Sequence, residues 1–94
     1  MKAMLLFHSK TDDACGAITE IKIWQVTVTD HTPYGLKYSL VYVERGVSII
    51  GYDNERGKGD HRHFDGEETL YQFTDVDSLL EDFRRDVAQW RGDS

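Results

Sequence analysis

The spacing of the apolar residues changes once along this chain of 94 residues, and that change sets the class of fold. Between residues 36 and 44, large apolar side chains occupy every second position, which is the period of a half-buried strand. Between residues 76 and 90 the spacing becomes three, four and seven, the stripe of an amphipathic helix formed by Val76, Leu79, Leu80, Phe83, Val87 and Trp90. β-rich segments followed by one such helix predict an α+β fold.

The remaining β-rich segments are residues 1–9, 17–29, 47–52 and 69–73. Asp and Gly residues between 10 and 16 suit a turn, and Arg45-Gly46 predicts a tight reversal between antiparallel strands. We expect an antiparallel sheet of four to five strands, with the helix of about residues 75–91 packed on one face. Thr74 and Gly92 are its predicted caps. The length suits a single domain over residues 1–94.

The charge of the chain limits its partners. Eleven Lys and Arg against seventeen Asp and Glu give a net charge of −6. That sign argues against a protein that binds nucleic acid over a wide surface, so any such contact must be local. The acidic residues of the C-terminal third, which would attract a basic partner, are Asp65, Glu67, Glu68, Asp75, Asp77, Glu81, Asp82 and Asp86.

Cys15 is the single cysteine, so no internal disulfide is expected. No apolar run approaches the roughly 20 residues that a membrane helix needs. The first apolar run breaks at His8 and Lys10, too early for a signal peptide. We therefore expect a cytoplasmic protein with no membrane contact.

The segment Gly51–His63, GYDNERGKGDHRH, holds the densest chemistry in the chain. If residues 60–63 are extended, His61 and His63 project to the same face, roughly 6–7 Å apart, while Arg62 faces the other way. Histidine titrates nearest to neutral pH, so such a pair can supply a general base and a general acid. Asp60 or Asp53 could orient one of the two rings.

This set of residues suits a ribonuclease that needs no metal and no other cofactor. A base removes the proton of a ribose 2′-OH, an acid protonates the leaving 5′-oxygen, and cations hold the phosphate. Lys58 and Arg56 are the candidate cations, and the glycines on either side of Lys58 would let the backbone approach a phosphate.

Other interpretations of the same residues stay open. His-x-His on one strand is also a way to place two metal ligands, with Asp53, Asp60 or His8 as a third, which would make a metal-dependent nuclease. The segment could instead be a solvated loop that binds a protein partner without catalysis.

A second set of residues could form a cationic and aromatic platform for a nucleotide strand. Lys22 and Lys37 stand beside Trp24 and Tyr38 on the expected strands. Lysines on such a face can equally well extend into water.

The chain resembles the TumE family of small prokaryotic toxins. The sharpest part of the resemblance is Tyr52-Asp53-Asn54 followed by Lys58-Gly-Asp60-His61-Arg62-His63, and the helix Val-Asp-Ser-Leu-Leu-Glu-Asp-Phe and the strand Glu-Ile-Lys-Ile-Trp also match. The resemblance spans nearly the whole chain. It implies the toxin of a type II toxin–antitoxin system that cleaves RNA, with a helix-turn-helix antitoxin as its partner.

The resemblance carries over to matched positions alone. The matched positions are Tyr52, Asp53, Asn54, Lys58, Asp60, His61, Arg62 and His63. Among them we expect catalytic roles for His61, His63, Asp60 and Asp53, and substrate contacts by Tyr52, Asn54, Lys58 and Arg62; Arg56 is added on charge alone. An exposed first or last strand would allow edge pairing, so a homodimer is among the partners considered.

Overall fold

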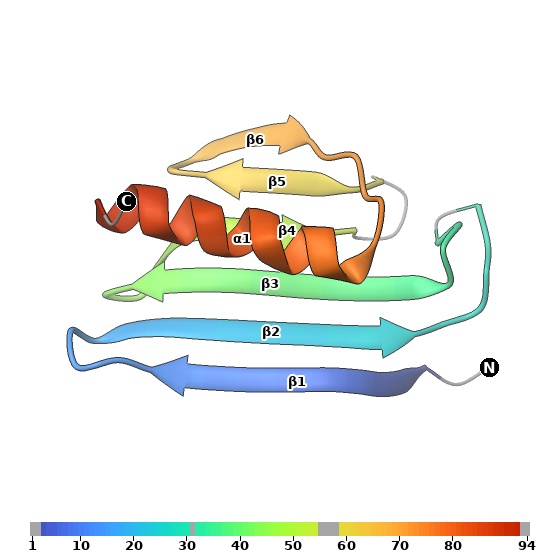
Figure 1. Cartoon of the computed structure of the whole chain (residues 1–94), viewed down its shortest axis with the longest axis horizontal. Coiled ribbons are helices and arrows are strands. Elements are labelled where there is room, and N and C mark those ends of the chain that lie inside the picture. Colours follow the sequence, from blue (N-terminus) through green and yellow to red (C-terminus); the bar gives the residue numbers. More distant parts are fainter. Residues whose placement is uncertain (1–2, 31, 55–58, 93–94) are drawn as a thin grey trace.

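The computed structural model describes residues 3–30, 32–54 and 59–92, which form one sheet and one helix (Figure 1). The strands are β1 (Met4–Asp12), β2 (Ala17–Gln25), β3 (Leu36–Glu44), β4 (Val47–Asp53), β5 (His61–Phe64) and β6 (Glu67–Leu70). They lie in the sheet in chain order, and every neighbouring pair is antiparallel. Helix α1 (Val76–Arg91) crosses one face. The α+β class is thus confirmed.

The sheet has six strands instead of the predicted four to five, because residues 61–70 form a hairpin. Its two-residue turn is Asp65-Gly66, with φ values of 50° and 86°. Positive φ at both positions is the condition for the turn type that matches strand twist. The strand predicted at residues 69–73 therefore starts earlier and ends at Leu70. The predicted reversal at Arg45-Gly46 has the same geometry, with φ values of 52° and 78°.

The core lies between α1 and the middle strands. On β3, Tyr38, Leu40 and Tyr42 are each at most 2% exposed, as their alternation predicts. The helix contributes Leu79 and Phe83, which are similarly buried. Among the described residues, ten buried apolar side chains make up this core: Ala17, Ile23, Tyr38, Leu40, Tyr42, Ile50, Tyr52, Phe73, Leu79 and Phe83.

Both ends of the helix are capped. Asp75 is the N-cap, because its carboxylate accepts a 2.7 Å hydrogen bond from the Ser78 amide. The predicted cap, Thr74, is one residue too early. That hydrogen bond lowers the pKa of Asp75 from its ordinary value. Gly92 ends the helix at φ 78°, where a residue without Cβ is favoured.

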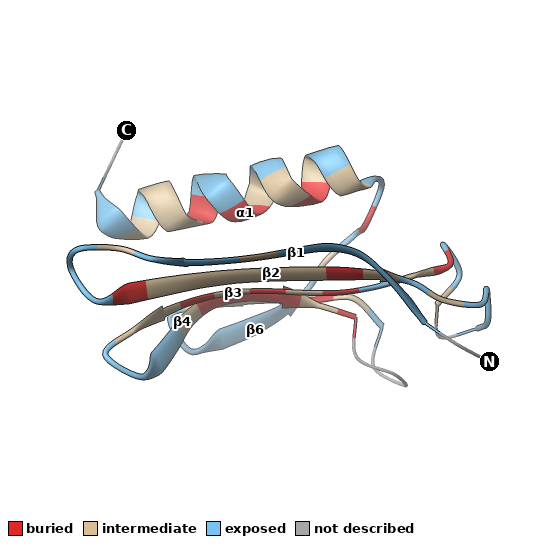
Figure 2. Ribbon diagram, turned by 90° about the horizontal axis from the view of Figure 1, so that it is seen from below, coloured by how far each residue is buried: buried red, intermediate tan, exposed pale blue. Residues whose placement is uncertain are grey.

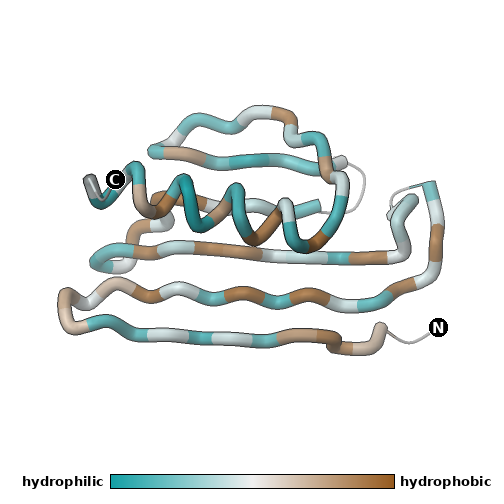
Figure 3. The backbone as a smooth tube through the Cα atoms, in the orientation of Figure 1, coloured by the Kyte–Doolittle hydropathy of each residue, from teal (hydrophilic) through white to brown (hydrophobic). Residues whose placement is uncertain are grey.

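The face of the sheet opposite α1 is covered by no described element, so a ligand can reach it (Figure 2). The hydropathy of β2 alternates along the strand, which reflects one covered and one open face (Figure 3). Register assigns Lys22 and Trp24 of β2 to the open face, since Ile21 and Ile23 pack on the core side.

Candidate functional site

Strand pairing brings His61 and His63 together on the open face. His61 pairs with Asp53 and His63 pairs with Gly51, without a register shift along β4 and β5. Glu68 of β6 is paired with His63 on the other side. Side chains of directly paired residues point to the same face. These five positions therefore form one continuous polar area across three strands.

His61 is held from two sides. Its side chain is 11% exposed. Its Nδ1 lies 3.1 Å from the Gly59 carbonyl oxygen, and since a carbonyl only accepts, Nδ1 carries the proton. The other ring nitrogen, Nε2, lies 3.4 Å from Oε2 of Glu68. The ring nitrogen opposite Nδ1 thus faces a carboxylate.

His63 is more accessible, with 39% of its side chain exposed. Its Nε2 lies 3.4 Å from Oδ2 of Asp53, and its Nδ1 lies 3.9 Å from Oε1 of Glu68. Each ring nitrogen therefore faces a carboxylate. Glu68 contacts one histidine with each of its two oxygens, so the two imidazoles share this acid.

A hollow of about 310 Å³ lies directly beside His63. Its lining residues are Ser39, Leu40, Val41, Ser48, Gly51, Asp53, His63 and Gly66. A Cβ at Gly51, which lines the hollow, would stand 3.7 Å from Cδ2 of His63. A glycine within a strand often marks the close approach of a ligand. A small polar group can therefore reach His63 and Asp53 together.

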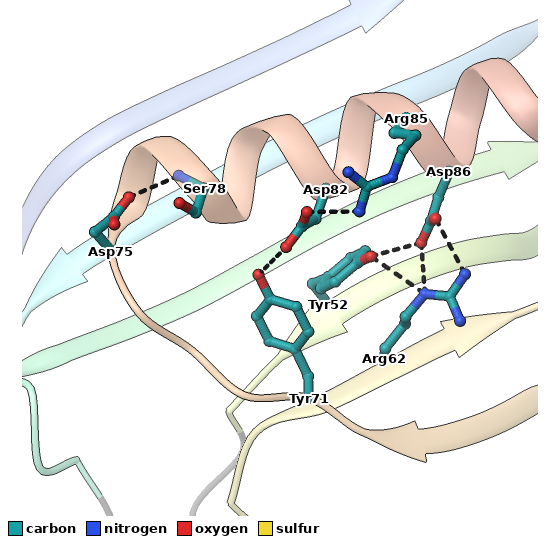
Figure 4. Close-up of polar contacts among 8 residues, drawn as sticks. All are labelled: Tyr52, Arg62, Tyr71, Asp75, Ser78, Asp82, Arg85 and Asp86. Carbon is teal, nitrogen blue, oxygen red and sulfur yellow. Dashed lines mark hydrogen bonds and ion pairs between the residues drawn. The ribbon is translucent and has the colours of Figure 1, made fainter.

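Tyr52 and Arg62 point to the opposite face, toward the helix (Figure 4). Arg62 donates to both carboxylate oxygens of Asp86, at 2.6 Å from Nε and 3.0 Å from a terminal nitrogen. The Tyr52 hydroxyl donates to Asp86 at 2.5 Å. Asp86 is only 3% exposed, while the Arg62 side chain is 32% exposed, so the ion pair is partly buried. A substrate role for Tyr52 and Arg62 stays a prediction.

The titration of these groups follows from their contacts. Burial, and then the hydrogen bond to Asp86, raise the pKa of Tyr52 above its usual range. The hydrogen bond to Asp86 likewise raises the pKa of Arg62 above the already high ordinary value of a guanidinium. Both side chains therefore stay protonated, and the cluster fastens β4 and β5 to α1.

Asn54 and Asp60 are bound to β3 and its surroundings. Asn54 is 5% exposed, accepts from the Tyr38 amide at 2.9 Å and donates to the Leu36 carbonyl at 2.8 Å. Asp60 accepts a 2.5 Å hydrogen bond from the Tyr38 hydroxyl. Burial and this contact raise the pKa of Tyr38 above its usual range. Both residues thus hold the ends of β4 and β5 in place.

The candidate cations Arg56 and Lys58 lie outside the described residues. Within residues 3–30, 32–54 and 59–92, no group of three or more His, Cys, Asp and Glu side chains is arranged so that it could hold a metal ion.

Two residues outside the predicted site contact its members. Composition places Glu68 and Asp86 only among the acidic residues of the C-terminal third. The Asp65-Gly66 turn could have revealed Glu68, because a two-residue turn places Glu68 opposite His63. Asp86 could have been noticed within the apolar stripe, three residues after Phe83 and seven after Leu79.

The fold and the site define a small α+β protein with a polar, histidine-bearing site on an open sheet face. The family model described as Toxin TumE matches residues 7–91. The chain therefore belongs to the TumE toxin family, as its resemblance predicted. Membership indicates that it is the toxin of a toxin–antitoxin system and implies an antitoxin partner. No match was found among the curated proteins or among the solved structures.

The described part of the chain contains no helix that is both long enough and apolar enough to span a membrane.

Proposed function

We propose that this toxin cleaves RNA without a metal ion, using His61 and His63 as the acid and base. The observation that carries the proposal is the placement of both imidazoles on one open sheet face, within 4 Å of the shared carboxylate of Glu68. The hollow beside His63 leaves room for the ribose and phosphate of a bound strand.

The reaction balances with these groups alone. One histidine takes the proton of the ribose 2′-OH, and the 2′-oxygen forms a bond to the adjacent phosphorus. The bond from phosphorus to the 5′-oxygen breaks, and the other histidine gives that oxygen a proton. The products are a 2′,3′-cyclic phosphate end and a 5′-hydroxyl end. Such acid–base assistance typically contributes 10²–10⁴-fold to a rate.

The carboxylates on the same face position and tune the imidazoles. Asp53 faces Nε2 of His63, and Glu68 faces both rings. Asp60 acts less directly, since its carboxylate binds Tyr38 and its carbonyl accepts from the Tyr71 amide. We assign Arg56 and Lys58 to phosphate binding because of their charge and their place in the matched motif.

The partners follow from the family and the proposed substrate. We propose an antitoxin of the helix-turn-helix class, and a cytoplasmic site of action because RNA is the substrate. A homodimer would form through β1, an exposed edge strand whose residues Met4, Leu5, Leu6 and Phe7 are 46–62% exposed. Light scattering on the protein and a Leu5→Lys variant tests this, because the variant should be monomeric if β1 pairs.

Growth inhibition tests the function in the cell. His63→Ala should abolish inhibition while circular dichroism shows a folded protein, because the His63 side chain is 39% exposed and is not part of the core cluster. Lys10→Ala, an exposed substitution on β1, is the matched control and should stay toxic. Undiminished toxicity of His63→Ala would remove His63 from the mechanism.

A further inference from the structure

The open face carries a second group of side chains, which the proposed catalytic site does not use. Trp24 of β2 and Lys37 of β3 are directly paired, and Nζ of Lys37 lies 5.8 Å from the centre of the Trp24 ring. Lys22, two positions before Trp24, shares its face. We call Lys22, Trp24 and Lys37 the tryptophan platform.

One row of paired positions connects this platform to the histidines. The row runs across four strands through Lys22, Ser39, Asp53 and His61. At about 4.8 Å between neighbouring strands, Lys22 lies roughly 14 Å from His61 across the sheet. A few nucleotides of a single strand can span that distance.

The charges of the platform favour an anion. Lys37 forms no ion pair with any described carboxylate. Among the described residues, Lys22 has one acidic neighbour, Oε2 of Glu20 at 3.7 Å, and that oxygen also binds Nε2 of His8 at 2.9 Å. The hydrogen bond to His8 lowers the pKa of Glu20. The Glu20 carboxylate therefore interacts with both His8 and Lys22 and is not paired with Lys22 alone. Net cationic character therefore remains beside the partly exposed indole.

We propose that the tryptophan platform is a subsite for single-stranded RNA, with Trp24 stacking on a base and Lys22 and Lys37 binding the flanking phosphates. An aromatic ring with adjacent cations is the usual arrangement in proteins that bind single strands. The inference rests on the proposed function, because the row leading to His61 is what selects RNA over an acidic peptide. A local contact of this kind is compatible with the net charge of −6.

Tryptophan fluorescence tests the stacking directly. The chain has two tryptophans, and Trp90 packs against Phe64 on the helix side. A Trp90→Phe variant thus reports on Trp24 alone. A short 2′-O-methyl oligouridylate serves as the probe, because it lacks the 2′-OH and cannot be cleaved by the proposed reaction. Saturable quenching by this probe is the expected result.

Substitutions separate stacking from charge. Trp24→Leu should weaken binding of the labelled probe at least about five-fold, the low end of what one base–aromatic stack contributes. Lys22→Ala with Lys37→Ala should lower the slope of log affinity against log salt by about 1.4, since each phosphate contact on a single strand contributes about 0.7. Arg84→Ala, on the helix, is the matched charge control and should leave the slope unchanged.

The outcomes are distinguishable from those of the proposed function. Unquenched Trp24, or full affinity in Trp24→Leu, would overturn the subsite even if the wild type cleaves RNA. If Trp24→Leu instead weakened binding of the antitoxin alone, the platform would be a protein interface and the subsite would again be wrong. Absence of both binding and cleavage would overturn the subsite and the proposed function together.

Discussion

Asp86 on α1 binds the Arg62 guanidinium on β5 through both carboxylate oxygens, at 2.6 and 3.0 Å. The Arg62 side chain is 32% exposed and that of Asp86 only 5%, so the pair closes the space between the helix and the sheet. The arginine in the centre of the predicted catalytic motif thus anchors the helix, while its two neighbouring histidines face away from the helix.

Removing the charge of Asp86 should destabilise the fold. Asp86→Asn leaves the Arg62 cation without its counter-ion in a partly buried place, and breaking such a pair costs about 3 kcal/mol. Urea denaturation should show the loss as a lower midpoint. Arg85→Ala is the control, because the Arg85–Asp82 pair is exposed and exposed pairs contribute little. Equal midpoints for wild type and Asp86→Asn would contradict a structural role.

Glu68 should matter for activity although it lies outside the matched motif. Glu68→Gln keeps the size of the side chain but removes the charge that faces both imidazoles. We expect slower RNA cleavage, with a loss smaller than the 10²–10⁴-fold expected for removing the base itself. Glu67→Gln, the adjacent exposed acid of β6, is the matched control. Identical rates for the two variants would show that Glu68 does not position the histidines.

Gly51→Ala should weaken RNA binding in the hollow beside His63 without unfolding the protein. The new methyl would meet the Leu40 carbonyl at 3.6 Å and the His63 ring at 3.7 Å, both ordinary van der Waals contacts. Thermal stability should be unchanged or higher, since alanine restricts the unfolded chain more than glycine does. RNA should bind more weakly, seen as a higher KM. An unaltered KM would place the substrate elsewhere.

The helix cap predicts a specific sensitivity to acid. The hydrogen bond from the Ser78 amide lowers the pKa of Asp75 below its ordinary value of 3.8. The charged cap therefore stabilises the folded protein at every pH above that ordinary value. That stability is lost as the pH falls through the lowered pKa. Asp75→Ala should reduce Tm at neutral pH. Asp75→Asn, which keeps an accepting oxygen, should retain Tm there and lose less of it in acid.

The elements that were predicted correctly depend on local patterns. The alternation in residues 36–44 and the stripe from Val76 to Trp90 each have one period and one buried face, so β3 and α1 follow directly. The Arg45-Gly46 pair predicted the β3–β4 hairpin, because a glycine suits the positive φ that a tight turn requires. The β5–β6 hairpin was missed because its strands, HRHF and EETL, are polar on both faces and show no apolar alternation.

The parts that were not predicted depend on contacts distant in sequence. The shared face of His61 and His63 follows from the period of a strand, and the structure has that arrangement. The partner of Arg62 lies 24 residues away on another element. The position of Asp86 within the apolar stripe indicates a covered side chain, but its partner Arg62 is defined only when α1 packs on the sheet.

The most direct test of the central claim is RNA cleavage in the presence of EDTA. Labelled RNA is incubated with the wild type and with a His61→Ala, His63→Ala double variant, and the fragments and their end groups are resolved on a denaturing gel. The account predicts fragments with 2′,3′-cyclic phosphate ends, made by the wild type alone. Intact RNA in both lanes, with cleavage restored by a divalent ion, would contradict it in favour of a metal-dependent nuclease.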